Sequence, residues 1–144
     1  TQVVNWRTGE TSTTDVVPGS TVPSVMGGRT FLVRHGSITV TDVATGKTVL
    51  EIPYGQGAPD LSPDGRYALV SGRDRATIYD VDNGADVSVP AGTWGWSADG
   101  DEVFRVHGST MTTCSAATGD CADSSIPPLG GDATVRYAGQ TFES

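Results

Sequence analysis

The chain has 144 residues, the size of one ordinary domain, with 19 glycines and 8 prolines but only 7% aromatic residues, which favours many short strands over long helices. Its 17 acidic and 9 basic residues give a net charge of -8, and a field of that sign repels phosphate backbones and argues against nucleic acid as a partner. No apolar run approaches the ~20 residues that span a bilayer, so we expect no membrane insertion by this segment.

A short turn pattern recurs four times along the chain. Its copies are Asn5–Gly9, Asp42–Gly46, Asp80–Gly84 and Ser115–Gly119, and their glycines are 37, 38 and 35 residues apart. Each copy lies between two extended stretches, so its Thr-Gly or Asn-Gly pair is typical of a hairpin turn whose glycine takes positive φ. The leading Asp, Asn or Ser is expected to cap the turn with its side chain.

A second turn pattern lies between the copies of the first. Ser62-Pro63-Asp64-Gly65 matches Ser97-Ala98-Asp99-Gly100, and Pro at the second position with Gly at the fourth suits a type I turn. The strand that follows is apolar on both faces and is expected between two packed layers, whereas the third strand alternates and the fourth is shorter and more polar. We predict second strands at 29–33, 66–70 and 101–106, third strands at 37–43, 75–81 and 110–115, and fourth strands at 48–52 and 86–89.

Four strands in every ~37 residues, with polarity rising outward, are what blades stacked around an axis require. The predicted fold class is therefore all-β, a β-propeller of four-stranded antiparallel blades, about four in this chain. Within a single domain of residues 1–144, the blades are predicted at 20–54, 55–91 and 92–128, with a fourth split between 129–144 and 1–19. The ring could close alone, pair with a second copy, or belong to a larger propeller. Few bulky residues are available to fill the wide gaps of a small ring, which favours more than four blades.

The residues of one repeat resemble a known family. Residues 61–71, Leu-Ser-Pro-Asp-Gly-Arg-Tyr-Ala-Leu-Val-Ser, followed by Ile78–Val81 and Asn83-Gly84, look like the repeats of WD40-like, YVTN and TolB-type β-propellers, and the likeness covers nearly the whole chain. True WD40 repeats carry a Gly-His pair, absent here, and a Trp-Asp dipeptide where this chain has Tyr79-Asp80. The resemblance implies the fold, and a fold that hosts so many activities does not imply one of them.

Two cysteines flank one of the hairpin turns. Cys114 and Cys121 stand where facing positions of an antiparallel hairpin bring Cβ atoms to disulfide distance, which favours a disulfide over free buried thiols. A metal site fits less well, because there is no second cysteine pair and neither histidine lies beside them in sequence. A disulfide indicates an oxidising, extracytoplasmic compartment. The pattern also resembles secreted actinobacterial propellers that crosslink this turn.

Two histidines and two tryptophans are the candidate ligand-binding residues. His35 and His107 both occur as His-Gly-Ser at the turn from second to third strand, which in the family lies on the face that most often binds ligands. A nucleophile-and-base pair would need an oriented third partner and an oxyanion site, so a repeat-derived turn residue is favoured. Trp94 and Trp96 flank Gly95 on an innermost strand and point the same way, and packing is favoured over a role in the floor of a binding site.

These observations predict a non-catalytic extracytoplasmic binding or assembly module for a protein or small-molecule partner. Trp94, Trp96, His35 and His107 are its candidate ligand-binding residues, and no catalytic residue, metal or cofactor is assigned. A homodimer that completes the propeller ring is a possible assembly. The alternative is a propeller enzyme, a hydrolase or lyase with its site at the channel mouth.

Overall fold

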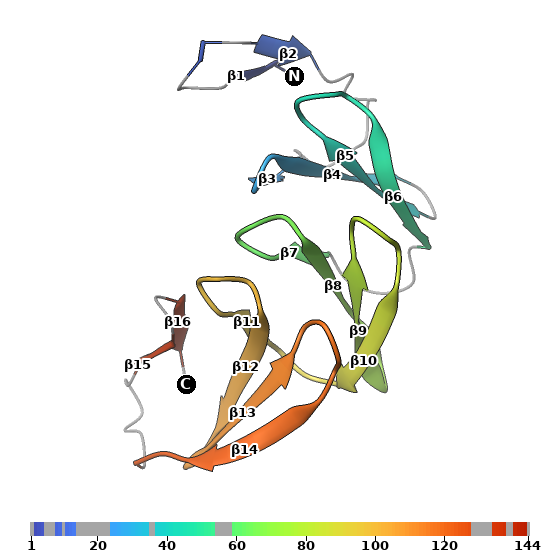
Figure 1. The fold of residues 1–144 in the computed structure, drawn as a ribbon. Helices are drawn as coiled ribbons and strands as arrows, with labels where there is room; N and C mark the ends of the chain where they lie inside the picture. The colour runs from blue at the N-terminus through green and yellow to red at the C-terminus, as the bar shows by residue number, and fades with distance from the viewer. Residues whose placement is uncertain are drawn as a thin grey trace.

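The computed structural model describes residues 2–4, 8–9, 11–13, 24–34, 37–53, 59–127, 134–137 and 140–143. Every regular element in these ranges is a β-strand. The strands form three four-stranded antiparallel sheets and two two-stranded hairpins. The sheets follow one another around an arc, with the first strand of each four-stranded sheet inside and the fourth outside (Figure 1). The predicted all-β architecture of propeller blades is confirmed.

Each four-stranded sheet is one blade, in which consecutive strands are neighbours and the first strand is the shortest. Blade I contains β3 (Ser24–Met26), β4 (Arg29–Arg34), β5 (Ser37–Asp42) and β6 (Thr48–Pro53). Blade II contains β7 (Asp60–Leu61), β8 (Tyr67–Ser71), β9 (Arg75–Asp80) and β10 (Asp86–Pro90). Blade III contains β11 (Gly95–Trp96), β12 (Glu102–His107), β13 (Thr110–Ser115) and β14 (Cys121–Ser125). The predicted second, third and fourth strands agree with these bounds to within one residue at each end.

Two hairpins lie at the ends of the described chain. They are β1 (Gln2–Val4) with β2 (Thr11–Thr13), and β15 (Thr134–Tyr137) with β16 (Gln140–Glu143). Each forms a two-stranded sheet of its own. That the two end segments together make one blade stays a prediction.

The middle blade is buried on both faces of its second strand, as the apolar sequence of β8 predicts. Ala68 belongs to a core cluster with Ile38 of blade I, whereas the next residue, Leu69, belongs to a cluster with Trp96 and Val103 of blade III. Successive side chains of a strand point to opposite faces, so one strand contributes to two inter-blade cores. The core of the molecule therefore lies between blades and not within them.

The turns between first and second strands contact each other from blade to blade. A Cβ on Gly27 would fall on the backbone carbonyl of Asp64, and a Cβ on Gly65 would come within 2.5 Å of the carbonyl oxygen of Met26. A Cβ on Gly100 would lie 2.7 Å from a carboxylate oxygen of Asp64. Glycine is thus required where these three turns meet.

Candidate functional site

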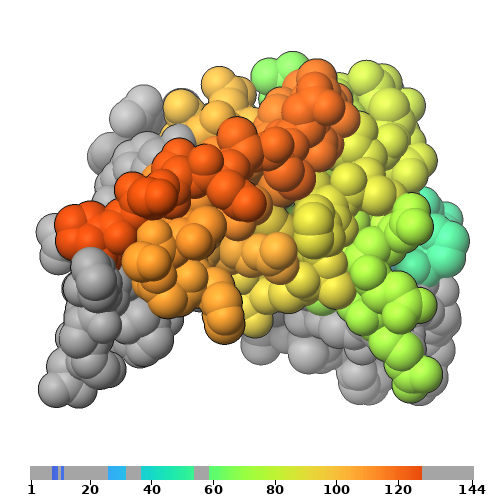
Figure 2. Space-filling model, turned by 90° about the horizontal axis from the view of Figure 1, so that it is seen from below, coloured from blue at the N-terminus to red at the C-terminus, as the bar shows by residue number. Residues whose placement is uncertain are grey.

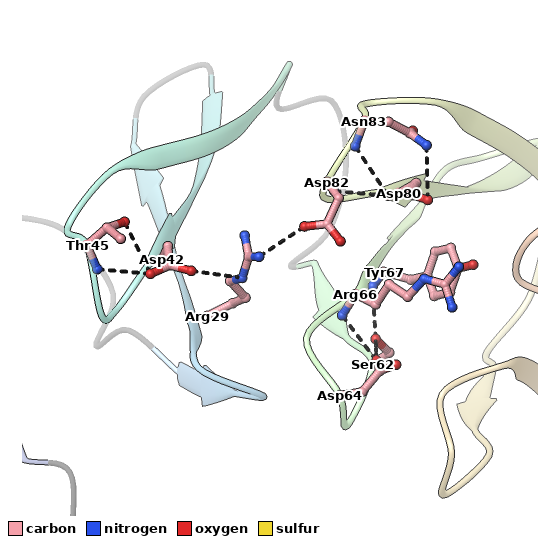
Figure 3. A network of polar contacts seen from close by, with 10 residues as sticks. All are labelled: Arg29, Asp42, Thr45, Ser62, Asp64, Arg66, Tyr67, Asp80, Asp82 and Asn83. Atoms are coloured by element: carbon pink, nitrogen blue, oxygen red, sulfur yellow. Dashed lines mark hydrogen bonds and ion pairs between the residues drawn. The ribbon is translucent and has the colours of Figure 1, made fainter. Parts of the chain in front are cut away.

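The turns between first and second strands carry the same hydrogen bonds in blades II and III. The Ser62 hydroxyl donates to Asp64 Oδ1 (2.5 Å) and accepts the backbone N–H of Tyr67 at 2.9 Å (Figure 3). Ser97 repeats this arrangement, with 2.6 Å to Asp99 Oδ1. Because the hydrogen bond from Ser97 favours the ionised carboxylate, it holds the pKa of Asp99 below its ordinary value. These serines and aspartates are structural parts of the repeat.

Arg29 links blade I to blade II at this end of the molecule. Its Nη2 lies 3.0 Å from Asp82 Oδ1 of blade II, and its Nε lies 3.5 Å from Asp42 Oδ2 of its own blade (Figure 3). Thr45 donates to Asp42 Oδ1 through its backbone N–H (2.9 Å) and its hydroxyl (3.2 Å), so Asp42 caps its turn as predicted. The N–H of Thr45 is the main reason that the pKa of Asp42 lies below its ordinary value.

The next interface lacks the matching carboxylate. Arg66 of blade II stands where blade I has Arg29, but Ala117 of blade III stands where blade II has Asp82. The Arg66 guanidinium instead lies over the Tyr67 ring, 5.0 Å from its centroid. A cleft of about 580 Å³ remains there, which we call the acidic cleft; it is lined by Arg66, Tyr67, Asp99, Asp101, Glu102, Ser115 and Ala117.

A second cleft, of about 570 Å³, lies at the opposite end of blade III. Arg105 faces Thr112 and His107 faces Thr110 in the register of β12 with β13, so these four side chains share one face of the sheet. Thr93 approaches from the linker that leads from blade II into β11. We call this the Arg105 cleft; its lining residues are Thr93, Arg105, Val106, His107, Thr110 and Thr112.

Arg105 is held in this cleft by its neighbours. Its Nη1 donates to the carbonyl oxygen of Ala91 at 2.7 Å, and its guanidinium lies over the Trp94 ring, 4.6 Å from the centroid. The Trp94 indole N–H donates to the carbonyl oxygen of Pro90 (2.9 Å), which orients the ring. A Cβ on Gly92 would approach Nη1 to 2.9 Å, so the glycine leaves room for the guanidinium. The cation–π contact and the hydrogen bond together fix the position of the charge.

The two candidate tryptophans have different surroundings. Both belong to the core cluster between blades II and III, so both indoles lie on one side of β11, as predicted. Trp96 is only 4% exposed and stacks on Tyr67 with 6.3 Å between ring centroids, and packing accounts for its position. Trp94 supports Arg105. On the other side of β11, the Phe104 ring fills the space left by Gly95.

Of the two candidate histidines, His107 is exposed and lines the Arg105 cleft, whereas His35 lies outside the described residues. The neighbouring Thr112 hydroxyl donates to Asp123 Oδ1 (2.6 Å) and not to an imidazole. The described residues also contain no group of three or more His, Cys, Asp or Glu side chains placed to hold a metal ion.

Arg105 was not among the residues predicted from the sequence. A usable signal was present, since Arg105 precedes His107 by two residues and therefore shares its face of a strand.

The cysteines form the predicted disulfide. Cys114 and Cys121 are directly opposite each other in β13 and β14, and the bond joins them with a Cα–Cα distance of 4.1 Å. All five residues of β14 are exposed, and the strand crosses the outer surface of blade III (Figure 2). The bond therefore attaches the outermost strand to its blade. Within the described part of the chain, no helix has the length and apolarity needed to cross a membrane.

No protein-family model and no curated protein matches this chain. Among solved structures, a eukaryotic initiation factor is similar with a TM-score of 0.61 and 10% identity, over 78% of this chain and 34% of the factor. The WD40 domain of SCAP from fission yeast has a TM-score of 0.50 and 19% identity, again over 78% and 34%. Kuenenia stuttgartiensis hydrazine synthase has a TM-score of 0.44 and 16% identity, over 81% and 41%. This chain thus spans about a third of the length of the first two structures. At such low identities the similarity shows the fold alone, a WD40-like β-propeller.

Proposed function

We propose that this chain is a non-catalytic binding module whose ligand occupies the Arg105 cleft. The observation that carries the proposal is the fixed guanidinium of Arg105 beside a space of about 570 Å³, within the range of small-molecule sites. Of the residues singled out in the sequence, His107 lines this cleft and Trp94 contacts its arginine. The ligand is a small molecule or an exposed group of a protein partner.

The proposed location is outside the cytoplasm. The disulfide joins an exposed residue, Cys121, to a buried one, Cys114, and such bonds persist in oxidising compartments. The resemblance of the repeat to YVTN, TolB-type and secreted actinobacterial propellers supports the same location. Protein exported by its native host and alkylated without reductant should contain no modified thiol, and two alkylated cysteines would contradict this location.

The assembly proposal concerns the two end hairpins. β1–β2 and β15–β16 are separate two-stranded sheets, each half the width of a blade. The other two strands of each blade would come from the hairpin at the other end of this chain, from a second copy, or from further sequence of the same polypeptide. Light scattering tests the paired ring: a mass near twice 14.9 kDa supports it, and a mass near 14.9 kDa removes it.

A nuclear magnetic resonance screen with small neutral, cationic and anionic molecules tests the binding function. Ligands of the cleft should shift the backbone amide signals of His107 and Thr112. The variant Thr110→Trp places an indole in the cleft and should weaken these ligands about tenfold or more, which is ~1.4 kcal/mol of binding free energy. The control variant Ser88→Trp places the same side chain on the exposed surface of β10 and should leave binding unchanged. The proposal would be refuted if Thr110→Trp did not weaken ligand binding. It would also be refuted if no molecule in the screen shifted the amide signals of the cleft residues.

A further inference from the structure

We infer that the Arg105 cleft recognises a carboxylate group of a small molecule, an inference that rests on the proposed binding function of this cleft. The side chains that line the cleft are one guanidinium, one imidazole, three threonine hydroxyls and one valine, with no carboxylate among them. This composition is unusual in a chain of net charge -8. An anion in this cleft meets hydrogen-bond donors where most of the surrounding protein would repel it.

Arg105 is the residue on which recognition depends. A guanidinium has five N–H donors in a planar fork that matches the two oxygens of a carboxylate. Among the described residues, the backbone carbonyl of Ala91 accepts from Nη1, and no carboxylate lies within ion-pair distance of the guanidinium. The charge is thus positioned by neutral groups, namely a carbonyl oxygen and the Trp94 ring. Because the position is fixed before a ligand arrives, little side-chain freedom is lost on binding.

The hydroxyl groups decide how an anion would lie. The Thr112 hydroxyl already donates to Asp123 Oδ1 at 2.6 Å, so its proton is engaged. Thr93 and Thr110 also line the cleft, and their hydroxyls can donate to a second oxygen. The cleft has one fixed positive charge, and the Asp123 carboxylate lies beside Thr112 on the same face of the sheet, so the cleft suits a singly charged carboxylate better than a doubly charged phosphate.

The acidic cleft provides an internal comparison. Its arginine, Arg66, also lies over an aromatic ring, but Asp99, Asp101 and Glu102 line the same space. Those three carboxylates offset its charge, so the acidic cleft is not expected to bind anions. The two clefts thus hold the same cation–π element in opposite electrostatic surroundings.

The test compares benzoate with its neutral amide, benzamide, at constant ionic strength maintained with chloride. Benzoate should shift the Arg105 side-chain Nε–H signal and the Thr110 amide signal, and benzamide should bind about tenfold more weakly because charge-assisted hydrogen bonds are the stronger ones. Arg105→Gln should weaken benzoate binding about tenfold, whereas the control Arg66→Gln in the acidic cleft should not change it. Thr110→Val keeps the arginine and should weaken binding about threefold through the loss of one hydrogen bond.

Each outcome decides the inference. Equal affinities for benzoate and benzamide would overturn it. Unchanged benzoate binding in both Arg105→Gln and Thr110→Val would also overturn it. If Arg105→Gln fails to fold, the result for Thr110→Val decides. Inorganic phosphate that binds tenfold more tightly than benzoate would overturn the assignment of a carboxylate. If neutral molecules shift the cleft signals but benzoate does not, only this inference fails. If no molecule shifts them, the proposed function fails as well.

Discussion

Replacing Gly27 by alanine should strongly destabilise the contact between blades I and II. Gly27 and Gly28 are neighbours in the β3–β4 turn, with φ of 52° and 75°. An alanine in this left-handed region costs about 1–2 kcal/mol at either position because its Cβ is crowded by its own backbone. A Cβ on Gly28 meets nothing within 4 Å, so Gly28→Ala should show this backbone cost alone.

Gly27→Ala has an additional cost. Its Cβ would overlap the Asp64 carbonyl and lie 2.5 Å from the backbone nitrogen of Gly65, and backbone atoms cannot rotate away as a side chain can. Overpacking of this kind costs about 1–3 kcal/mol, which brings the total to roughly 2–5 kcal/mol. That is a large share of the roughly 5–15 kcal/mol by which a domain is stable.

Equilibrium urea unfolding of the two variants measures the difference. Trp96 is a suitable fluorescence probe, since it stacks on Tyr67 across a blade interface and will be exposed on unfolding. The free energy of unfolding should be lower for Gly27→Ala than for Gly28→Ala by at least about 1 kcal/mol, with similar slopes against urea. Equal free energies for the two variants would show that the turns of blades I and II do not touch as described.

Three further predictions concern blade III. Ala117→Asp should supply the carboxylate that Arg66 lacks, with a coupling energy of up to about 1 kcal/mol in a double-mutant cycle with Arg66→Gln, and a value near zero would refute the correspondence with blade II. Ser97→Ala should raise the pKa of Asp99 toward 3.8 in a carboxyl NMR titration. Because the folded-state pKa of Asp99 is lowered, its ionised form stabilises the fold above pH 3.8, and this contribution disappears as the pH falls through the folded-state pKa; an unchanged pKa in the variant would contradict the argument. Reduction of the disulfide should lower the urea midpoint without unfolding the domain, because its short loop contributes less than the ~3 kcal/mol of a 15-residue loop, and global unfolding would contradict this.

The strands and turns were predictable because local chemistry determines them. Asp80 accepts the N–H of Asp82 and Asn83 in one kind of turn, and Gly65 donates to the Ser62 carbonyl oxygen (2.8 Å) in the other, as their sequences indicate. These interactions span only a few residues and therefore recur wherever the motif recurs. The shortest strands, β7 and β11, have two residues each and leave little periodicity to detect.

The candidate site was only partly predictable, because it depends on how distant segments meet. Trp94 was identified as an inward-pointing aromatic residue, but its contact with Arg105 arises from the pairing of β11 with β12 and from the path of the linker around Gly92. No pattern within either segment contains that information. The exposed position of His107 at the end of β12 was predictable from its motif, whereas the hydroxyl groups around it come from β13 and from the linker before β11.

The two-sided burial of β8 has a consequence for how the molecule opens. Blade II shares one core with blade I through Ala68 and another with blade III through Leu69. In such a one-dimensional array, the free energy of unfolding is a sum of contributions from each blade and from each interface between neighbouring blades. The blade that packs against a complete blade on each side is therefore the most difficult to unfold locally. Amide protons of β8 should therefore exchange with solvent mainly through global unfolding, and those of the blades on either side through smaller, local openings.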